Sequence, residues 1–217
     1  MKTKWMLLGA MALALATTAV AQDPPKIEIT GDYSYFRFNP SLPALQNRNL
    51  NGGGFDASFF LRPAIAFKAD LQFYGGTTYT TTFATGVNTS AGFIPAGTYS
   101  ANGTLKTYLF GPMVKARFHK FEPFGEVLFG VAHIDAYANL SKVIAATPTA
   151  TLHVQGYQNP FSLAAGGGVD LPVGKVFAIR IAEVDYVLTR LTNPLTSTNN
   201  QNHFRYIAGV QFRFGGK

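Results

Sequence analysis

The sequence predicts an all-β fold, an eight-stranded antiparallel up-and-down β-barrel that spans a membrane. Three observations predict it. Apolar residues recur at every second position in eight segments, the connections between these segments alternate between short and long, and the polar faces carry small or charged side chains. Because side chains alternate between the two faces of a strand, a period of two indicates strands with one apolar face each.

The eight segments follow one another with no helix expected between them. The expected strands cover residues 27–35, 55–62, 67–73, 105–113, 125–131, 162–171, 176–189 and 205–214. Short connections lie around Pro63, at 115–122 and at 172–174, whereas 38–53, 75–103, 135–159 and 189–202 are long and rich in Thr, Asn, Ser and Gly. If consecutive strands pair, all long loops lie at one end of the barrel, and both chain termini lie at the short-turn end.

The seventh segment breaks the alternation. Arg180 and Glu183 are three positions apart, so strict alternation would place them on opposite faces. A β-bulge near Ala182 would bring both to the polar face and send Ile181 and Val184 to the apolar face. We therefore predict a bulge in this strand.

The start of the chain has the pattern of a secretory signal peptide. Two lysines precede an apolar run at 6–16, and small residues at 19–21 form a cleavage signal. We expect residues 1–21 to be the signal peptide and residues 22–217 to be the barrel domain. The chain has no cysteine, so the exported protein would fold without disulfides.

The formal net charge of +7 comes from lysines and arginines that are scattered singly. No basic stripe forms, so the charge does not indicate nucleic-acid binding. Two interpretations stay open: contact with acidic lipid head groups, or no specific role.

The alternation alone fits a soluble barrel with its apolar face inward or a membrane barrel with that face toward lipid. The interior of an eight-stranded barrel is just wide enough for side chains, which suits the small and charged set. That set includes eight acids (Glu28, Asp32, Asp56, Asp70, Glu126, Asp170, Glu183, Asp185) and six bases (Arg62, Lys68, Lys106, Arg180, Arg205, Arg213). Buried charges persist when they are paired, so this near balance favours the membrane barrel.

Among these charges we predict a salt-bridge network that fills the lumen. Its predicted members are Asp56, Arg62, Lys68, Asp70, Glu126, Arg180, Glu183, Asp185 and Arg213. The outward apolar faces are expected to include Leu105, Thr107, Leu109 and Met113 of the fourth strand. Aromatic residues near strand ends, such as Tyr33 and Phe73, would form interfacial girdles.

The last strand carries the pattern Gly209-Val-Gln-Phe212-Arg-Phe214. Together with the export signal and the alternating strands, it resembles bacterial outer-membrane β-barrels of the OmpA transmembrane-domain and related small-barrel type. The resemblance covers essentially all of residues 22–217. It implies a monomer in the outer membrane of a Gram-negative bacterium, surrounded by outer-membrane lipid. It also implies that Gly209, Phe212 and Phe214 form the signal that the barrel-assembly machinery recognises.

Other motifs give weaker indications. His133, His153 and His203 lie near the long-loop end, where a metal cluster is conceivable, and His133 with Ser162 would suit a lipid hydrolase. The run at 77–82 would extend the third strand beyond the membrane and offer an edge for binding another chain. Gly166 to Gly168 lie inside a strand with no following helix, which indicates close strand packing rather than phosphate binding.

The function expected from the sequence is therefore structural or interactive, carried by four long loops that could hold a surface ligand or partner. We assign no catalytic residue, metal or cofactor, and we expect no enzymatic activity and no nucleic-acid partner. The alternatives are a lipid-modifying outer-membrane enzyme and a narrow, porin-like channel for ions or small solutes.

Overall fold

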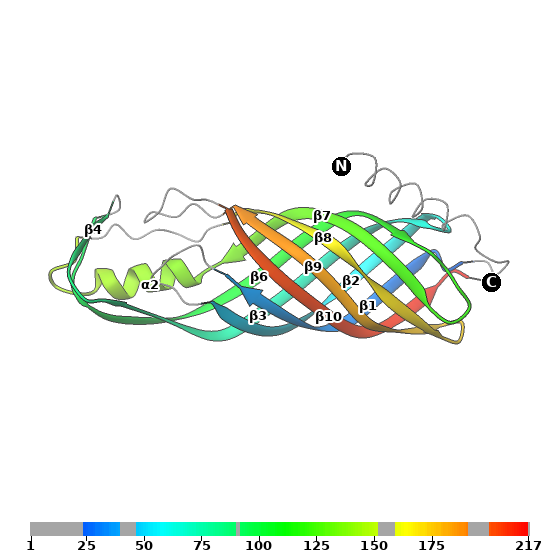
Figure 1. Ribbon diagram of the computed structural model, residues 1–217, viewed down its shortest axis with the longest axis horizontal. Coiled ribbons are helices and arrows are strands. Elements are labelled where there is room, and N and C mark those ends of the chain that lie inside the picture. Colours follow the sequence, from blue (N-terminus) through cyan, green and yellow to red (C-terminus); the bar gives the residue numbers. More distant parts are fainter. Residues whose placement is uncertain (1–23, 40–46, 90–91, 152–158, 191–199, 217) are drawn as a thin grey trace, which may run out of the picture.

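The computed structural model describes residues 24–39, 47–89, 92–151, 159–190 and 200–216. Eight long strands close into a barrel (Figure 1). They are β1 (Ile27–Phe38), β2 (Arg48–Arg62), β3 (Ile65–Phe83), β6 (Gly97–Lys115), β7 (Glu122–Ile134), β8 (Phe161–Val173), β9 (Phe177–Arg190) and β10 (Asn200–Phe214). The predicted signal peptide lies outside the described residues.

Each strand pairs antiparallel with its neighbours in the order β1-β10-β9-β8-β7-β6-β3-β2. The barrel closes between β1 and β10, where Ile27 pairs with Phe214 at one end and Arg37 pairs with Phe204 at the other. The predicted eight-stranded antiparallel barrel is thus confirmed, and the start of β1 and the end of β10 share the short-turn end.

The predicted bulge is present in β9. Ala182 pairs with Val169 and Arg180 pairs with Asp170, so Ile181 is the extra residue. As a result Arg180 and Glu183 are both buried inside, while Ile181 and Val184 are exposed outside. Without the bulge, one of the two charged groups would face lipid, which costs roughly 2–4 kcal/mol for an Arg at mid-depth.

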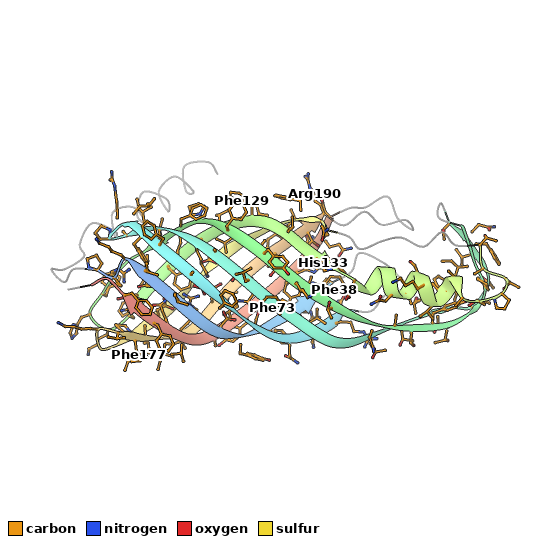
Figure 2. All side chains as sticks on the ribbon, turned by 180° about the vertical axis from the view of Figure 1, so that it is seen from behind. Phe38, Phe73, Phe129, His133, Phe177 and Arg190 are labelled. Atoms are coloured by element: carbon orange, nitrogen blue, oxygen red, sulfur yellow. The ribbon has the colours of Figure 1, made fainter. Side chains whose placement is uncertain are left out.

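The outer wall of the barrel is an apolar belt, and the polar side chains lie inside. Large exposed apolar residues occur on every barrel strand, among them Ile29, Phe59, Phe67, Phe110, Val127, Phe129, Phe177, Ile179, Tyr186 and Phe212. Figure 2 shows Phe73, Phe129 and Phe177 on the wall. In a soluble barrel these rings would be turned inward. The inside-out arrangement predicted from the sequence is therefore the one observed.

The sequence-based prediction assigned the wrong face of β6 to the lumen. Leu105, Leu109 and Met113 are buried inside the barrel, and Tyr108 and Phe110 face outward. Lys106, expected in the lumen, consequently lies on the outer wall. This strand carries apolar residues on both faces, so its alternation does not state which face is inside. The register with β3 decides it, because Lys106 pairs with Phe73, which faces outward.

The strands β3 and β6 continue far beyond the barrel (Figure 1). Between them lies a small hairpin of β4 (Val87–Thr89) and β5 (Gly92–Ile94). A helix, α2 (Ala136–Ala145), follows β7 and packs against the extended part of β6. The expectation of no helix between strands was therefore wrong at this loop. No helix in the described part of the chain is long and apolar enough to cross a membrane.

We call this protruding unit the head, and define it as residues 77–89, 92–103 and 135–151. It stands at the end of the barrel opposite to the paired start of β1 and end of β10 (Figure 1). The sequence expectation that residues 77–82 extend the third strand is confirmed, since β3 runs to Phe83.

Candidate functional site: the charged lumen and the head

The middle of the lumen is organised around Arg180 of β9. Its guanidinium donates to Asp56 Oδ2 at 2.5 Å, Glu183 Oε2 at 2.7 Å and Asp170 Oδ1 at 2.9 Å. It also lies over the ring of Phe124, 4.6 Å from the centroid. All of these groups are buried. The side chain of one cation therefore pairs with three carboxylates, which come from β2 (Asp56), β8 (Asp170) and β9 (Glu183).

Two further cations complete this middle layer. Lys68 Nζ donates to Glu126 Oε2 and Glu183 Oε2, each at 2.9 Å. Arg205 donates to Asp70 Oδ1 at 2.7 Å and Asp185 Oδ2 at 2.8 Å. Since β2, β3, β7, β9 and β10 all contribute, the ion pairs connect opposite walls of the barrel. They fill the space that a pore would need.

A second charged layer lies nearer the short-turn end. Lys115 bridges Glu28 at 2.5 Å and Asp170 at 2.7 Å. Arg117 contacts Glu28 at 2.9 Å and Glu122 at 3.2 Å, and Arg213 also pairs with Glu122. The two layers share Asp170, which accepts from both Lys115 and Arg180.

The long-loop end of the lumen is filled by apolar side chains instead. Phe36, Phe38, Leu50, Tyr74, Leu105, Leu109, Leu128, Ile134 and Val187 are buried there and belong to one cluster. Phe38 stacks on His203, with ring centroids 4.8 Å apart. The His203 ring accepts from the Asn39 backbone N–H at 3.1 Å and lies 2.9 Å from Thr189 Oγ1. Figure 2 shows Phe38 at this end of the barrel, beside the head. We call this cluster the apolar layer.

The structure brings together most of the network predicted from the sequence. Asp56, Lys68, Asp70, Glu126, Arg180, Glu183, Asp185 and Arg213 all lie inside the barrel. Arg62 does not join them, because it is exposed at the end of β2, where a register shift turns it away from the lumen.

Sequence reasoning missed Lys115, Arg117 and Glu122, which it treated as parts of a short turn. The structure extends β6 to Lys115 and starts β7 at Glu122, so these residues still belong to the barrel interior or its rim. Lys115 shares its strand face with Met113 and Glu122 shares its face with Phe124, so the inward facing of these two apolar residues places both charges in the lumen. Sequence reasoning also missed the apolar layer, because it expected the apolar residues of each strand to face lipid and none of them to lie inside the barrel.

Three carboxylates, those of Glu126, Glu183 and Asp185, lie close enough to bind a metal ion. Lys68 Nζ already lies 2.9 Å from two of them, and Arg205 pairs with the third. These two cations supply the positive charge that the cluster requires.

The candidate histidine sites are not assembled. His133 lies on the outer wall of β7, where its Nδ1 is 2.7 Å from Asn159 Oδ1 (Figure 2). His203 lies inside, and Ser162 is also buried inside, on the other side of the barrel wall from His133. His153 lies outside the described residues. The residues considered for a hydrolase and for a metal cluster therefore face different environments.

The Gly166–Gly168 segment supports close strand packing, as the sequence indicated. A Cβ on Gly166 would lie 2.1 Å from the Val184 carbonyl oxygen, and one on Gly168 would lie 2.8 Å from the Phe124 ring. The absence of side chains here leaves room for Phe124 to reach the Arg180 guanidinium.

The head has its own small hydrophobic core. Ile94, Tyr99 and Ile144 are buried together, with Phe83, Leu140 and Ala150 packed against them. The opposite face of the β3–β6 ribbon is exposed and carries hydroxyl and amide pairs across the strands. Thr78 pairs with Asn102 at 2.9 Å, Thr80 with Ser100 at 2.9 Å, and Thr82 with Thr98 at 3.0 Å.

The helix α2 is fixed to β6 at its N-terminal end. The Asp135 carboxylate accepts from the Thr104 backbone N–H, and from Thr104 Oγ1 at 2.8 Å. Asn139 Nδ2 donates to the Asn102 carbonyl at 2.9 Å. Thr151 and Phe93 exchange hydrogen bonds at 3.0 and 3.2 Å, which ties the chain after the helix to β5. The head is therefore a folded unit rather than an open loop.

No family model matches the chain, and no curated protein matches it. Solved structures do. Neisserial surface protein A aligns with 87% of this chain and 97% of its own, at a TM-score of 0.55 and 11% identity. Ail, the attachment invasion locus protein of Yersinia pestis, aligns with 88% of this chain and 99% of its own, at a TM-score of 0.46 and 12% identity. The E. coli outer membrane protein W aligns over the same shares of the two chains, at a TM-score of 0.42 and 12% identity.

The fold, the exposed apolar belt and the charged interior define the class: this is a closed eight-stranded antiparallel β-barrel with the apolar outer wall of a membrane barrel, and it shares its fold with neisserial surface protein A. This chain combines a lumen that holds two charged layers and one apolar layer with a folded head in which a helix packs on a β-ribbon.

Proposed function

We infer that the protein is a monomeric outer-membrane anchor whose head mediates a surface interaction. The observation that carries this proposal is the head itself, which has a hydrophobic core separate from the barrel. A hairpin that merely connected two strands would not need a helix docked on it. A loop that is held in a fixed geometry by its own core suits contact with another molecule.

The ribbon offers two surfaces to a partner. Its exposed face carries three side-chain pairs between directly opposite residues of β3 and β6: Thr78 with Asn102, Thr80 with Ser100, and Thr82 with Thr98. Its β3 edge, residues 77–83, pairs with β6 alone among the described strands. An extended segment of a partner protein could add to that edge by backbone hydrogen bonds, as strands do in β-augmentation.

The closed lumen supports an anchoring role over a conducting one. Arg180, Lys68 and Arg205 connect opposite walls, and the apolar layer blocks the long-loop end. A narrow channel would require these groups to separate. We expect the purified wild-type protein to show no stepwise conductance in a planar bilayer, and regular steps would favour the channel alternative.

Enzymatic action on lipid has less support, because His133 and Ser162 face opposite sides of the wall. We propose no catalytic residue. Mass analysis of bilayer lipid after incubation with the folded protein tests this, and a new lipid product would refute the non-enzymatic assignment.

The decisive experiment compares intact cells that display the wild type with cells that display a variant in which residues 76–102 are replaced by a four-residue turn. We expect the wild type to capture a partner protein or cell surface that the variant does not. Gel migration with and without boiling must show that both barrels are folded. Equal capture by both would refute a role of the head.

A further inference from the structure

The two edges of the β3–β6 ribbon in the head differ (Figure 1). On the β6 edge, the Thr104 carbonyl accepts from the Asp135 backbone N–H. The Asn102 carbonyl accepts from Asn139 Nδ2, and α2 packs along this strand. On the β3 edge, residues 77–83 pair with β6 and with no other described strand. Within the described part of the chain, one edge is therefore closed by the helix and the other is open to a further strand.

The closed edge fixes which residues of β3 face the open one. Because the Asn102 carbonyl points to the helix, it points away from β3, so Asn102 and its partner Thr78 form a non-hydrogen-bonded pair. This geometry recurs at every second pair of an antiparallel ladder, and residues 77–83 pair with β6 without a register shift. Thr78, Thr80 and Thr82 therefore direct their backbone N–H and C=O groups to the open edge.

The open edge lacks the features that usually protect a free strand. Such edges are blunted by charged side chains, by proline or by bulges. Residues 77–83 contain no charge and no proline, and they are mostly threonine, which favours the extended conformation. The described residues of the head carry one carboxylate, Asp135, and one cation, Lys142. Their charges cancel, so two heads can approach each other without net repulsion.

From this arrangement we propose that the open edge pairs antiparallel with the same edge of a second copy of this chain, displayed on a neighbouring cell. The proposal rests on the proposed function, because it names the partner of the head. Pairing centred on Thr80 places Thr80 opposite its own copy and Thr78 opposite Thr82. Three such pairs, with two backbone hydrogen bonds each, exchange about six hydrogen bonds.

The exposed face of the ribbon is self-complementary in the same register. Within one copy, the side chains of Thr78, Thr80 and Thr82 already bond side-chain oxygens of β6 at 2.9–3.0 Å. Between two copies, threonine stands opposite threonine at all three positions. Cross-strand threonine pairs are stabilising, and a hydroxyl that already donates can also accept. Self-pairing therefore continues the existing row of hydroxyl pairs across four strands.

The direction of β3 assigns the two copies to opposing membranes. In each copy β3 runs from the short-turn end toward the head (Figure 1). Two copies in one membrane therefore present this edge in parallel, whereas copies in two facing membranes present it antiparallel, as a two-fold contact of identical edges requires. The pairing of β3 with β2 ends at Tyr74, six residues before Thr80, so the rims of the two barrels would stand at most about 40 Å apart.

A segment of a different protein fits the same edge less well. In β-augmentation the backbone supplies affinity, while alternate side chains select the partner. Thr78, Thr80 and Thr82 present no charge, so they favour a neutral, β-branched strand. The strand of this chain that has that composition and the matching spacing is residues 77–83 itself.

The test mixes two populations of cells that display the protein, each with its own fluorescent label and with truncated surface polysaccharide, and counts two-coloured clusters by flow cytometry. The variant T78K/T80K/T82K sets lysine opposite lysine in the proposed register, and should lower the fraction of clustered cells on the order of tenfold. The matched control T98K/S100K/N102K puts three lysines on the same face of β6. There the charges of the two copies lie about 14 Å apart, beyond a Debye length of ~8 Å, so the control should cluster like the wild type.

The decisive mixture combines cells that display T78K/T80K/T82K with cells that display T78E/T80E/T82E. Neither population should cluster with itself, whereas the mixture should return to within about twofold of the wild type, because opposite charges then face each other at every pair. Absence of wild-type clustering, equal clustering by the lysine variant, or no recovery in the mixture would overturn the proposal. Heat-dependent gel migration and unchanged protease resistance of the head must show that all variants are folded.

The failure of this proposal differs from the failure of the proposed function. If wild-type cells do not cluster but capture another partner that the variant with residues 76–102 replaced does not, the head keeps its surface interaction and the second copy is excluded as its partner. If capture by that variant equals capture by the wild type, the interaction of the head itself is refuted.

Discussion

Replacing Arg180 by alanine is the sharpest test of the closed lumen. The side chain is buried and contacts Asp56, Asp170 and Glu183 at 2.5–2.9 Å. Its removal leaves three carboxylates around a cavity beside Phe124. Lys68 and Lys115 still neutralise part of that charge, since they lie 2.9 Å from Glu183 and 2.7 Å from Asp170.

Breaking a buried ion pair by removing one partner costs about 3–5 kcal/mol, because the remaining charge is buried without compensation. We expect Arg180→Ala to lower the free energy of unfolding by about that amount. The expected loss stays within that range, rather than tripling for three contacts, since the other cations remain in place. The matched control is Arg62→Ala, which removes an exposed arginine and should change the free energy by less than about 0.5 kcal/mol.

The assay is equilibrium unfolding in urea, followed by circular dichroism and by the fraction of folded protein on unboiled gels. Tryptophan fluorescence is unsuitable, because the only tryptophan of the chain, Trp5, lies in the predicted signal peptide. If Arg180→Ala and Arg62→Ala unfold at the same urea concentration, the network does not stabilise the barrel. A combined D56N/R180M variant should recover part of the loss, because it removes a buried charge on each side.

Three further predictions concern other parts of the chain. Ile144→Asp places a charge in the core of the head, where Ile144 is 3% exposed, and should make the head sensitive to protease while the barrel stays folded. The control Val143→Asp changes a residue of α2 that is 41% exposed, and it should not increase cleavage of the head. Gly168→Val should destabilise the barrel by more than about 1 kcal/mol in urea unfolding, because the new side chain would overlap Phe124; an unchanged midpoint would contradict the packing. Combined alanine substitution of Phe212 and Phe214 should slow insertion by the assembly machinery, measured as the rate at which the heat-resistant gel band appears, and an unchanged rate would remove the proposed assembly signal.

Part of the fold could be read directly from the sequence, because it depends on neighbouring positions. The period of two in segments such as β1 and β7 gives strands and separates their faces. The odd spacing of Arg180 and Glu183 indicated the bulge for the same reason, since only an extra residue returns both to one face.

The facing of β6 could not be obtained in this way. Leu105, Leu109 and Met113 alternate with Tyr108 and Phe110, so both faces are apolar and neither is marked as the lipid face. The sequence-based prediction chose the wrong one, and Lys106 was placed inside as a result. The head was also missed as a folded unit, because its core joins β5, β6 and α2 across a long connection.

What the amino-acid sequence determined by itself is the set of strands, the bulge and the inward placement of most charged groups, all of which follow from alternation along a single segment. Only the tertiary structure decided which carboxylate meets which cation, because partners such as Asp56 and Arg180 are 124 residues apart and meet across the barrel. It also decided which face of β6 lies inside, because the register with β3 pairs Lys106 with the outward-facing Phe73.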